Sequence, residues 1–261
     1  MKNIRSVGII IQVRSSSEIF KNKFIKKINK LSIISFLIKR LLNYSKDINL
    51  IIAIPNKDIK IYSHIKKIKN IKIFFGKKND VLDRYYKCAL KYNLDTIVRL
   101  TGDNPLIDLD LMFDSLKKHL KLKKKFTTNC IGDTFPNGFE FEILDKSTLK
   151  YLWKNSSLKS EKEHVTPLIY KLIKKKKVKK KEFIAIKDKT KKYSSLRLTI
   201  DKPIDLFVVK KVHKLLKKNR LNINYKNIVK IYKSNHKLFQ LNHKEVRDEG
   251  YKTSVLNEKK K

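Results

Sequence analysis

Two aspartates follow apolar segments that are typical of buried strands, and carboxylates at such positions can bind a metal ion. Asp103 lies in RLTGDNPLID (99–108), and Asp201 lies in LRLTIDKPID (196–205). Mg²⁺ often takes one or two protein carboxylates, with substrate phosphates and water completing its coordination. We therefore predict that both aspartates are metal ligands. The residues alone leave open a second role for Asp201, as the cap of a helix that Pro203 begins.

A polar loop, QVRSSSEIFKNK (12–23), follows the first apolar run of the chain. Its Arg14, Lys21 and Lys23 offer cations, and its serines offer hydroxyl and backbone donors, for the oxygens of a phosphate group. In open α/β sheets, ligands bind outside the carboxyl ends of the strands. The loop is therefore a candidate phosphate site, although a polar loop after a strand is common and is weak evidence by itself.

The elements that must position these residues alternate between strand and helix in the first half of the chain. Alternation of this kind predicts a mostly parallel sheet with crossover helices, an α/β fold. We expect strands over 6–13, 48–54, 71–75 and 96–100, and helices over 31–44, 56–68, 81–92 and from Asp108 to about 119.

The pattern is looser in the second half. We expect strands over 126–130, 139–144, 182–186 and 195–200, and helices from Ser147 and over 161–173, 204–218 and 225–236. These elements fit a single α/β domain over residues 1–240. The polar residues 241–261 predict a loosely ordered C-terminal tail.

The formal net charge of +40 raises the question of a polyanionic partner. Of the 64 basic residues only 8 are arginine, and the lysines are spread through every segment, as an AT-rich coding sequence would also produce. Surfaces that read nucleic acids usually rely on arginine for bidentate contacts. We therefore expect no specific nucleic-acid partner, and a polyanion-binding protein remains the less favoured alternative.

The length of 261 residues and a hydrophobic content of 41% suffice for a sizeable core. The longest apolar runs fall well short of the roughly 20 residues that a membrane-spanning helix needs. The N-terminal residues contain no apolar stretch of the kind that a signal peptide requires. We therefore expect a cytoplasmic protein without a membrane span.

These segments, in this order, resemble the cytidylyltransferase family that activates sugar acids such as sialic acid and 3-deoxy-manno-octulosonate. The closest likeness is to its spore-coat-polysaccharide (SpsF-like) branch, and it extends over essentially the whole chain. It rests on six blocks in register, to which the near-terminal RDEGYKTSV (247–255) adds: QVRSSSEIFKNK (12–23), DVLDRYY (80–86), VRLTGDNPLID (98–108), FPNGFEFEIL (135–144), SEKEHVTPLIY (160–170) and LRLTIDKPID (196–205).

The resemblance implies a Rossmann-like nucleotide-diphospho-sugar transferase fold, a mostly parallel sheet flanked by helices. It also implies transfer of CMP from CTP to a sugar acid of the nonulosonic or octulosonic type, release of pyrophosphate, a role in surface polysaccharide biosynthesis, and a homodimer. It assigns catalytic roles to Asp103, Asp201 and Lys23, Mg²⁺ to Asp103 and Asp201, nucleotide binding to Gln12, Arg14, Ser17, Lys23, Arg84, Thr101 and Gly102, and acceptor binding to Glu140 and His164.

The chain departs from the family pattern in the phosphate loop. Ser16 replaces a glycine, Ile19 an arginine, Lys21 a proline and Asn22 a second glycine. Loss of an arginine that grips phosphate weakens binding, and a lysine does not restore its bidentate fork. A catalytically reduced relative and a nucleotidyltransferase for another donor nucleotide are therefore kept as alternatives. The residues also leave open a solvated strand face for Glu140, and a capping or packing role for His164.

Overall fold

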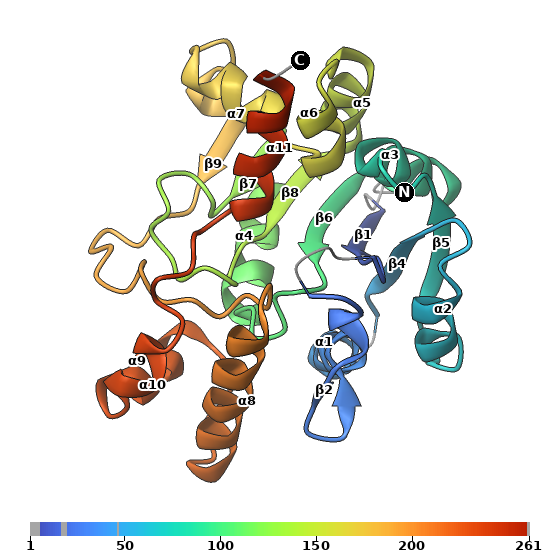
Figure 1. Cartoon of the computed structure of the whole chain (residues 1–261). Helices are drawn as coiled ribbons and strands as arrows, with labels where there is room; N and C mark the ends of the chain where they lie inside the picture. Colours follow the sequence, from blue (N-terminus) through green and yellow to red (C-terminus); the bar gives the residue numbers. More distant parts are fainter. Residues whose placement is uncertain (1–5, 17–19, 46, 260–261) are drawn as a thin grey trace.

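Seven strands form one twisted sheet in the computed structural model, which describes residues 6–16, 20–45 and 47–259 (Figure 1). The strand order is β5-β4-β1-β6-β8-β7-β9, and only β8 runs against the others. This confirms the mostly parallel α/β sheet that the sequence predicts. The strands are β1 (Val7–Gln12), β4 (Asn49–Pro55), β5 (Lys72–Gly76), β6 (Thr96–Thr101), β7 (Phe126–Thr128), β8 (Glu142–Asp145) and β9 (Phe183–Ala185).

Helices cover both faces of this sheet. The short pair β2 (Lys27–Ile28) and β3 (Leu31–Ser32) lies outside it, after the 3-10 turn η1 (Lys23–Ile25), and a second turn, η2 (Lys180–Glu182), precedes β9. The helices are α1 (Ile33–Tyr44), α2 (Ile59–Ile65), α3 (Val81–Lys91), α4 (Leu109–Lys121), α5 (Lys146–Asn155), α6 (Lys159–His164), α7 (Pro167–Lys174), α8 (Pro203–Lys218), α9 (Tyr225–Lys233), α10 (His236–Gln240) and α11 (Glu249–Lys259).

The apolar run of β1 explains why the sheet is buried on both sides. Ile9 and Ile11 point into a core shared with α1, α2 and α4, whereas Ile10 points into a second core shared with α3, α5 and α7. Successive side chains of a strand face opposite sides of the sheet, so a strand that is covered on both faces needs apolar residues throughout. The sheet therefore holds the end of β1 in a fixed place between two helical layers.

A third core lies beyond the carboxyl ends of the central strands, under α8, α9 and α10. The segment 195–200 belongs to it, and the prediction of a strand there is wrong, because only Arg197 forms a bridge, with Asn137. Leu198 and Ile200 are fully buried against this core, which accounts for the alternating apolar pattern. The segment is extended, but it runs along two loops instead of pairing with a strand.

The helix predicted over 161–173 is interrupted. Val165 has a φ angle of 73°, and the chain turns there from α6 into α7. Pro167 is the first residue of α7, where its missing N–H leaves no hydrogen bond unmade. The break changes the direction of the chain, so that His164 is the last residue of α6 instead of lying in the middle of a longer helix.

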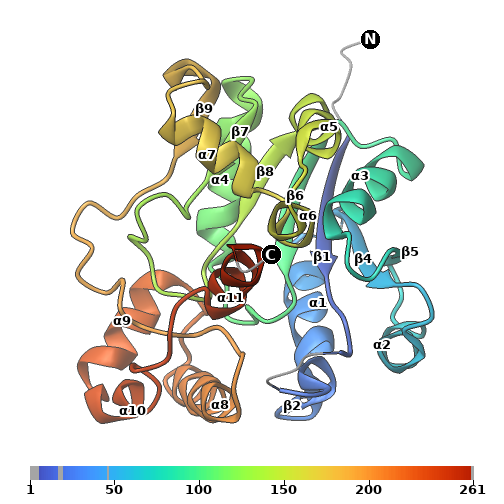
Figure 2. The ribbon, with the colours of Figure 1, turned by 45° about the horizontal axis from the view of Figure 1, so that its top comes forward.

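The loosely ordered tail that the sequence predicts from residue 241 is instead docked on the domain. It carries α11, which lies in front of the sheet beside α6 (Figure 2). The carboxylate of Glu258 accepts hydrogen bonds from the backbone N–H and the hydroxyl of Ser160, at 2.6 and 2.7 Å. The docking of α11 depends on polar contacts such as these, and the spacing of apolar residues in the sequence does not reveal polar contacts. None of the helices in the described part of the chain has the length and apolar character that a membrane crossing requires.

Candidate active site

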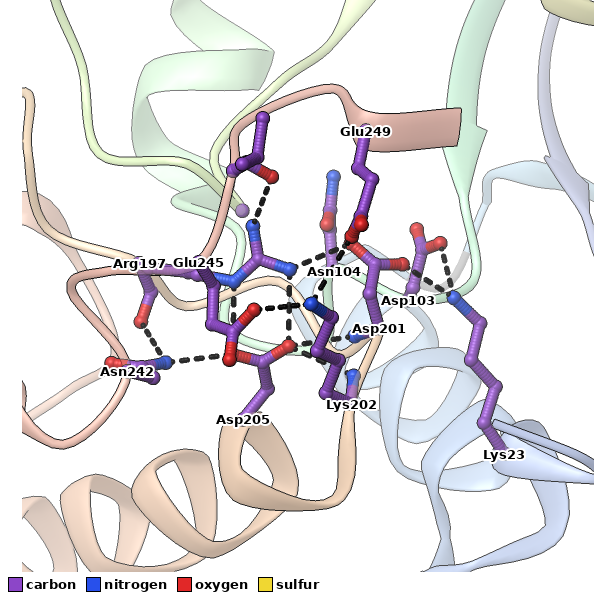
Figure 3. A network of polar contacts seen from close by, with 12 residues as sticks. Lys23, Asp103, Asn104, Arg197, Asp201, Lys202, Asp205, Asn242, Glu245 and Glu249 are labelled. Carbon is purple, nitrogen blue, oxygen red and sulfur yellow. Dashed lines mark hydrogen bonds and ion pairs between the residues drawn. The ribbon is translucent and has the colours of Figure 1, made fainter. Parts of the chain in front are cut away.

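The two predicted metal ligands meet at the carboxyl edge of the sheet. The backbone N–H of Ile200 donates to the carbonyl oxygen of Asp103 over 2.9 Å, which ties the loop after β6 to the segment that carries Asp201. Lys23 Nζ lies between the two carboxylates, 2.9 Å from Asp103 Oδ2 and 2.8 Å from Asp201 Oδ1 (Figure 3). The structure therefore brings together all three residues to which the sequence assigns catalytic roles.

The charges of this trio stabilise one another. Burial disfavours the ammonium of Lys23, but the attraction of Asp103 and Asp201 outweighs it and keeps the pKa of Lys23 above its usual value. Burial also disfavours the carboxylate of Asp103, but the charge of Lys23 and a hydrogen bond from Thr101 hold the pKa of Asp103 below its usual value. Lys23 and Asp103 are therefore set to be charged at neutral pH.

A buried arginine orients Asp201 from its other side. Arg197 Nη2 donates to Asp201 Oδ2 at 3.0 Å, and the same guanidinium grips Asp205 at 2.9 Å through Nε and at 3.1 Å through Nη2. Asp205 also accepts from the backbone N–H groups of Asp201 and Lys202, at 3.0 and 2.9 Å. Asp205 therefore caps α8, and the carboxylate of Asp201 stays free of the capping role that the sequence leaves open.

The C-terminal residues complete this network. Asn242 Nδ2 donates to Asp205 at 2.8 Å, and the carbonyl oxygen of Val246 accepts from Arg197 at 3.2 Å. Lys202 Nζ forms ion pairs with Glu245 and, at 3.3 Å, with Glu249. The residues around Asp201 are therefore held partly by a segment that lies some 40 positions further along the chain.

The ends of β1 and β6 place three predicted nucleotide-binding residues side by side. Gln12 pairs in register with Thr101, and its carbonyl oxygen accepts from the N–H of Gly102 at 3.1 Å. A Cβ at Gly102 would lie 2.2 Å from Val13 Cγ1, so this close approach requires glycine. Among the described residues, no group hydrogen-bonds the buried side-chain oxygen of Gln12. An orphaned buried acceptor at a strand end fits contact with a bound ligand.

The phosphate loop is only partly within the described residues. Ser17 and Ile19 lie outside them. The backbone of Asn22 is left-handed, with φ 57°, directly before the turn that carries Lys23. Asparagine is the residue that tolerates this conformation best after glycine, so its replacement of the family's glycine has a structural explanation. Arg14 Nη2 contacts Glu163 of α6 at 3.1 Å, and both side chains are about one third exposed.

Arg84 lies on the other side of the sheet, where α3 packs on β5. It is 1% exposed, its stem lies against Gly76, and its Nη1 donates to the carbonyl oxygen of Lys77 at 3.1 Å. Burial, and to a lesser degree repulsion from Arg14, lowers the pKa of Arg84 to about 10. In this conformation Arg84 is packed between α3 and β5 and offers no open surface to a nucleotide.

Glu140 does not lie on a solvated strand face, because β8 begins only at Glu142. Its Oε2 accepts from the N–H of Gly138 at 2.7 Å and from Asn104 Nδ2 at 3.3 Å, and its Oε1 accepts from Arg247 at 2.7 Å. Burial raises the pKa of Glu140 to about 7, although Arg247 opposes the shift. Through Asn104, Glu140 is one residue away from Asp103, the predicted metal ligand.

His164 ends α6 and faces α11. Its Nε2 lies 3.3 Å from Ser254 Oγ, and its ring meets the ring of Tyr251 edge-on, with centroids 5.1 Å apart. Burial lowers the pKa of His164 to about 4, which keeps the ring neutral at physiological pH. The structure therefore places His164 against the C-terminal helix, and Glu163 beside it links that helix to Arg14.

The pair Asp103 and Asp201 fits a magnesium ion by its chemistry. Both carboxylates converge on one cation, the ammonium of Lys23. In the part of the chain that the structure describes, no group of three or more histidine, cysteine, aspartate and glutamate side chains could hold a metal ion. Two carboxylates with open positions are what Mg²⁺ takes when phosphates and water supply its remaining ligands.

Sequence reasoning missed Arg197, Asp205, Asn242 and Arg247. Arg197 and Asp205 are eight positions apart in the block LRLTIDKPID, and a buried arginine among apolar neighbours was the available signal. Asn242 and Arg247 lie in a polar segment without periodicity. Only the folded arrangement shows that they contact the site.

Sequence comparison finds a family model and relatives that match most of the chain. The sequence model described as cytidylyltransferase matches residues 8–239. An uncharacterized protein of Methanocaldococcus jannaschii is 36% identical over 165 residues, which are 62% of this chain and just under two thirds, 65%, of that protein. The spore coat polysaccharide biosynthesis protein SpsF of Bacillus subtilis is 27% identical over 169 residues, 62% of this chain and 69% of SpsF.

Solved structures give the same result. A cytidylyltransferase from Leptospira borgpetersenii serovar Hardjo-bovis is 30% identical, with a TM-score of 0.80 over 90% of this chain and 97% of that one. A CMP:2-keto-3-deoxy-manno-octonic acid synthetase complexed with CTP has a TM-score of 0.60 at 13% identity, over 80% of this chain and 99% of that one. At that identity the second likeness concerns the fold alone, and it is the nucleotidyltransferase fold that the resemblance implies.

Proposed function

The chain belongs to the cytidylyltransferase family, and from this premise we propose that it transfers CMP from CTP to a sugar acid and releases pyrophosphate. The observation that carries the proposal is the convergence of Asp103, Asp201 and Lys23 at the edge of the sheet. Ligands of open α/β sheets bind at this edge. The orphaned side-chain oxygen of Gln12, at the end of β1, supports a nucleotide at the same place.

In the proposed reaction, a hydroxyl oxygen of the acceptor forms a bond to the α-phosphorus of CTP. The bond between that phosphorus and the oxygen bridging to the β-phosphate breaks, pyrophosphate leaves, and the proton of the hydroxyl passes to solvent. Such a transfer needs no protein nucleophile, and positioning with charge stabilisation accounts for most of the catalysis. Lys23 is suited to stabilise the phosphate oxygens, because its ammonium is buried and held in place.

Asp103 and Asp201 would hold the magnesium ion of the proposed reaction. When bound, the ion neutralises negative charge on the triphosphate and orients it. Arg197 keeps Asp201 oriented, and Thr101 donates to Asp103. In this structure Lys23 occupies the space between the two carboxylates. It must therefore share them with the ion or turn toward the phosphates when both substrates are present.

The sugar-acid acceptor and a role in surface polysaccharide biosynthesis form the finer part of the proposal. They are supported by the family resemblance, and by a relative whose name refers to spore coat polysaccharide biosynthesis. Glu140 and His164 are the proposed acceptor-side residues. A homodimer, common in this family, is proposed on the same ground.

The test is release of pyrophosphate with Mg²⁺ and CTP, ATP, GTP or UTP, each combined with a panel of nonulosonic and octulosonic acids. We expect turnover with CTP and at least one acid, loss of turnover with EDTA, and recovery with excess Mg²⁺. Asp103→Asn should lower the rate by about 100-fold or more. Asp114→Asn, the same change on the exposed face of α4, should leave the rate within about twofold of the wild type.

Each other outcome has a defined meaning. Turnover with another nucleotide in place of CTP would identify that nucleotide as the donor. Silence with every donor and acceptor would refute the proposed reaction. Tight, steeply salt-dependent binding of RNA that survives Asp103→Asn, in a protein without turnover, would favour the polyanion-binding alternative.

A further inference from the structure

The C-terminal segment (242–258) lies beyond the part of the chain that the family model matches, which ends at residue 239. It nevertheless packs against the site, and α11 lies in front of the sheet beside α6 (Figure 2). What family members share is the chemistry on the nucleotide, whereas the acceptor is what distinguishes one member from another. A segment that lines the site outside the family model, and whose RDEGYKTSV (247–255) is similar to one branch of the family, is therefore a place to look for acceptor specificity.

This segment contacts the surroundings of Asp201 through Asn242, Glu245 and Val246, and its remaining contacts are on the acceptor side. The two proposed acceptor residues are Glu140 and His164. Arg247 hydrogen-bonds to Glu140, and Ser254 and Tyr251 contact His164. In the described part of the chain, no hydrogen bond joins the C-terminal segment to Lys23 or to the side chains at the ends of β1 and β6. Among the described residues of the phosphate loop, the segment approaches Arg14, through Glu163, which contacts both Ser254 and Arg14.

Arg247 determines how Glu140 is presented. Its Nη2 donates to Glu140 Oε1 at 2.7 Å, its Nη1 to the carbonyl oxygen of Phe135 at 3.0 Å, and its Nε lies 3.3 Å from Asp133 Oδ1. The planar guanidinium is thus held by two hydrogen bonds and by an ion pair with Asp133. A lysine in its place would keep the charge but would lose this fork geometry.

Glu140 retains capacity for one more donor. The carboxylate of Glu140 accepts hydrogen bonds from Gly138, Asn104 and Arg247. Its side chain is still 23% exposed, so a ligand can reach the carboxylate with a further donor. Next to it, the buried side-chain oxygen of Asn104 accepts no hydrogen bond from any described residue. Two unfilled acceptors side by side match the hydroxyl donors of a sugar.

We propose that Arg247 of the C-terminal segment is a positioning residue for acceptor specificity, because it holds Glu140 so that its free acceptor position receives a hydroxyl of the sugar. The inference rests on the proposed function, and it adds the residue and the segment that select the acceptor. Glu140 contacts the substrate, whereas Arg247 acts through Glu140.

The test separates the KM for the acceptor from the KM for CTP, with 3-deoxy-manno-octulosonate and N-acetylneuraminate as probes and pyrophosphate release as the signal. Arg247→Gln should raise the acceptor KM by about tenfold or more, because a charge-assisted contact is lost, and should leave the CTP KM within about twofold. Arg247→Lys should recover part of the loss. Arg220→Gln, the same change at an exposed position after α8, should alter neither constant.

A Glu140→Gln background shows whether Arg247 acts through Glu140. There, Arg247→Gln should change the acceptor KM by less than about twofold, since coupled residues are not additive. An equal rise of both KM values, an unchanged acceptor KM, or full additivity would overturn the inference. If Arg247→Gln does not fold, Arg247→Lys in both backgrounds gives the same comparison. A wild type that is silent with both probes and with every other acid would refute the proposed function instead, and this inference with it.

Discussion

The backbone N–H of Ile200 donates to the carbonyl oxygen of Asp103 over 2.9 Å, and this bond joins the two loops that carry the acidic pair. Neither loop belongs to a regular strand at this point. The distance between the two carboxylates is therefore set by backbone pairing between irregular segments, and Arg197 and Lys23 fix the orientation of the side chains. Four predictions follow from this arrangement and from the contacts around it.

Removing Arg197 should destabilise the protein strongly. Arg197 is 4% exposed and Asp205 is fully buried, so Arg197→Ala leaves a carboxylate without its partner in the interior. Breaking a buried pair in this way costs about 3–5 kcal/mol. Lys117→Ala, which breaks the exposed pair with Asp114, should cost less than about 1 kcal/mol. Urea unfolding measures both, and equal costs for the two variants would contradict the buried network.

The left-handed residue of the phosphate loop offers a matched pair of substitutions. Asn22 has φ 57° and its N–H donates to the carbonyl oxygen of Ser15 at 3.2 Å. Asn22→Ala should lower the free energy of unfolding by about 1 kcal/mol, because alanine is strained in the left-handed region, which asparagine tolerates better. Asn22→Gly should be tolerated and should retain turnover, since glycine adopts this conformation freely. A more stable alanine variant would show that the turn is not left-handed.

His164 should make the fold sensitive to acid. Its pKa is about 6.5 when exposed and about 4 in the folded protein, mainly because of burial. Between these values the unfolded chain binds a proton that the folded chain does not, so stability is full above pH 6.5 and falls as the pH drops toward 4. His164→Gln should reduce the loss of stability between pH 7 and pH 5, measured by urea unfolding. His64→Gln, at an exposed position of α2, should leave that loss unchanged. Identical pH profiles for His164→Gln and the wild type would contradict the burial of the ring.

The docking of α11 should depend on Glu258. Its carboxylate accepts from the N–H and the hydroxyl of Ser160, contacts that a charged acceptor strengthens. Glu258→Ala should speed hydrogen exchange of the amides of α11 by about tenfold or more and leave the exchange of β1 unchanged. Lys252→Ala, at an exposed position of the same helix, serves as the control. Equal exchange in both variants would mean that other contacts hold the helix.

The central sheet could be predicted because its signals are local. The runs that form β1, β4 and β6 are mostly apolar, as burial on both faces requires, and their bounds agree with the structure to within one or two residues. The sequence places the start of α4 at Asp108, and there the side chain of Asp108 caps the helix, accepting from the N–H of Leu111 at 3.0 Å. The residues that set the hydrophobic period or cap a helix lie within a few positions of the element they affect, so these signals can be read from the sequence.

The sequence by itself also determined the family, since the ordered blocks match a known pattern, and it singled out the two acids, since each follows its own apolar segment. Only the tertiary structure decided which groups meet. Lys23 reaches two acids that are 80 and 178 positions away, and Arg247 reaches Glu140 across 107 positions. The same holds for the path of 195–200 and for the docking of α11. Such contacts depend on where the whole chain folds, and no local pattern of polar residues encodes their partners.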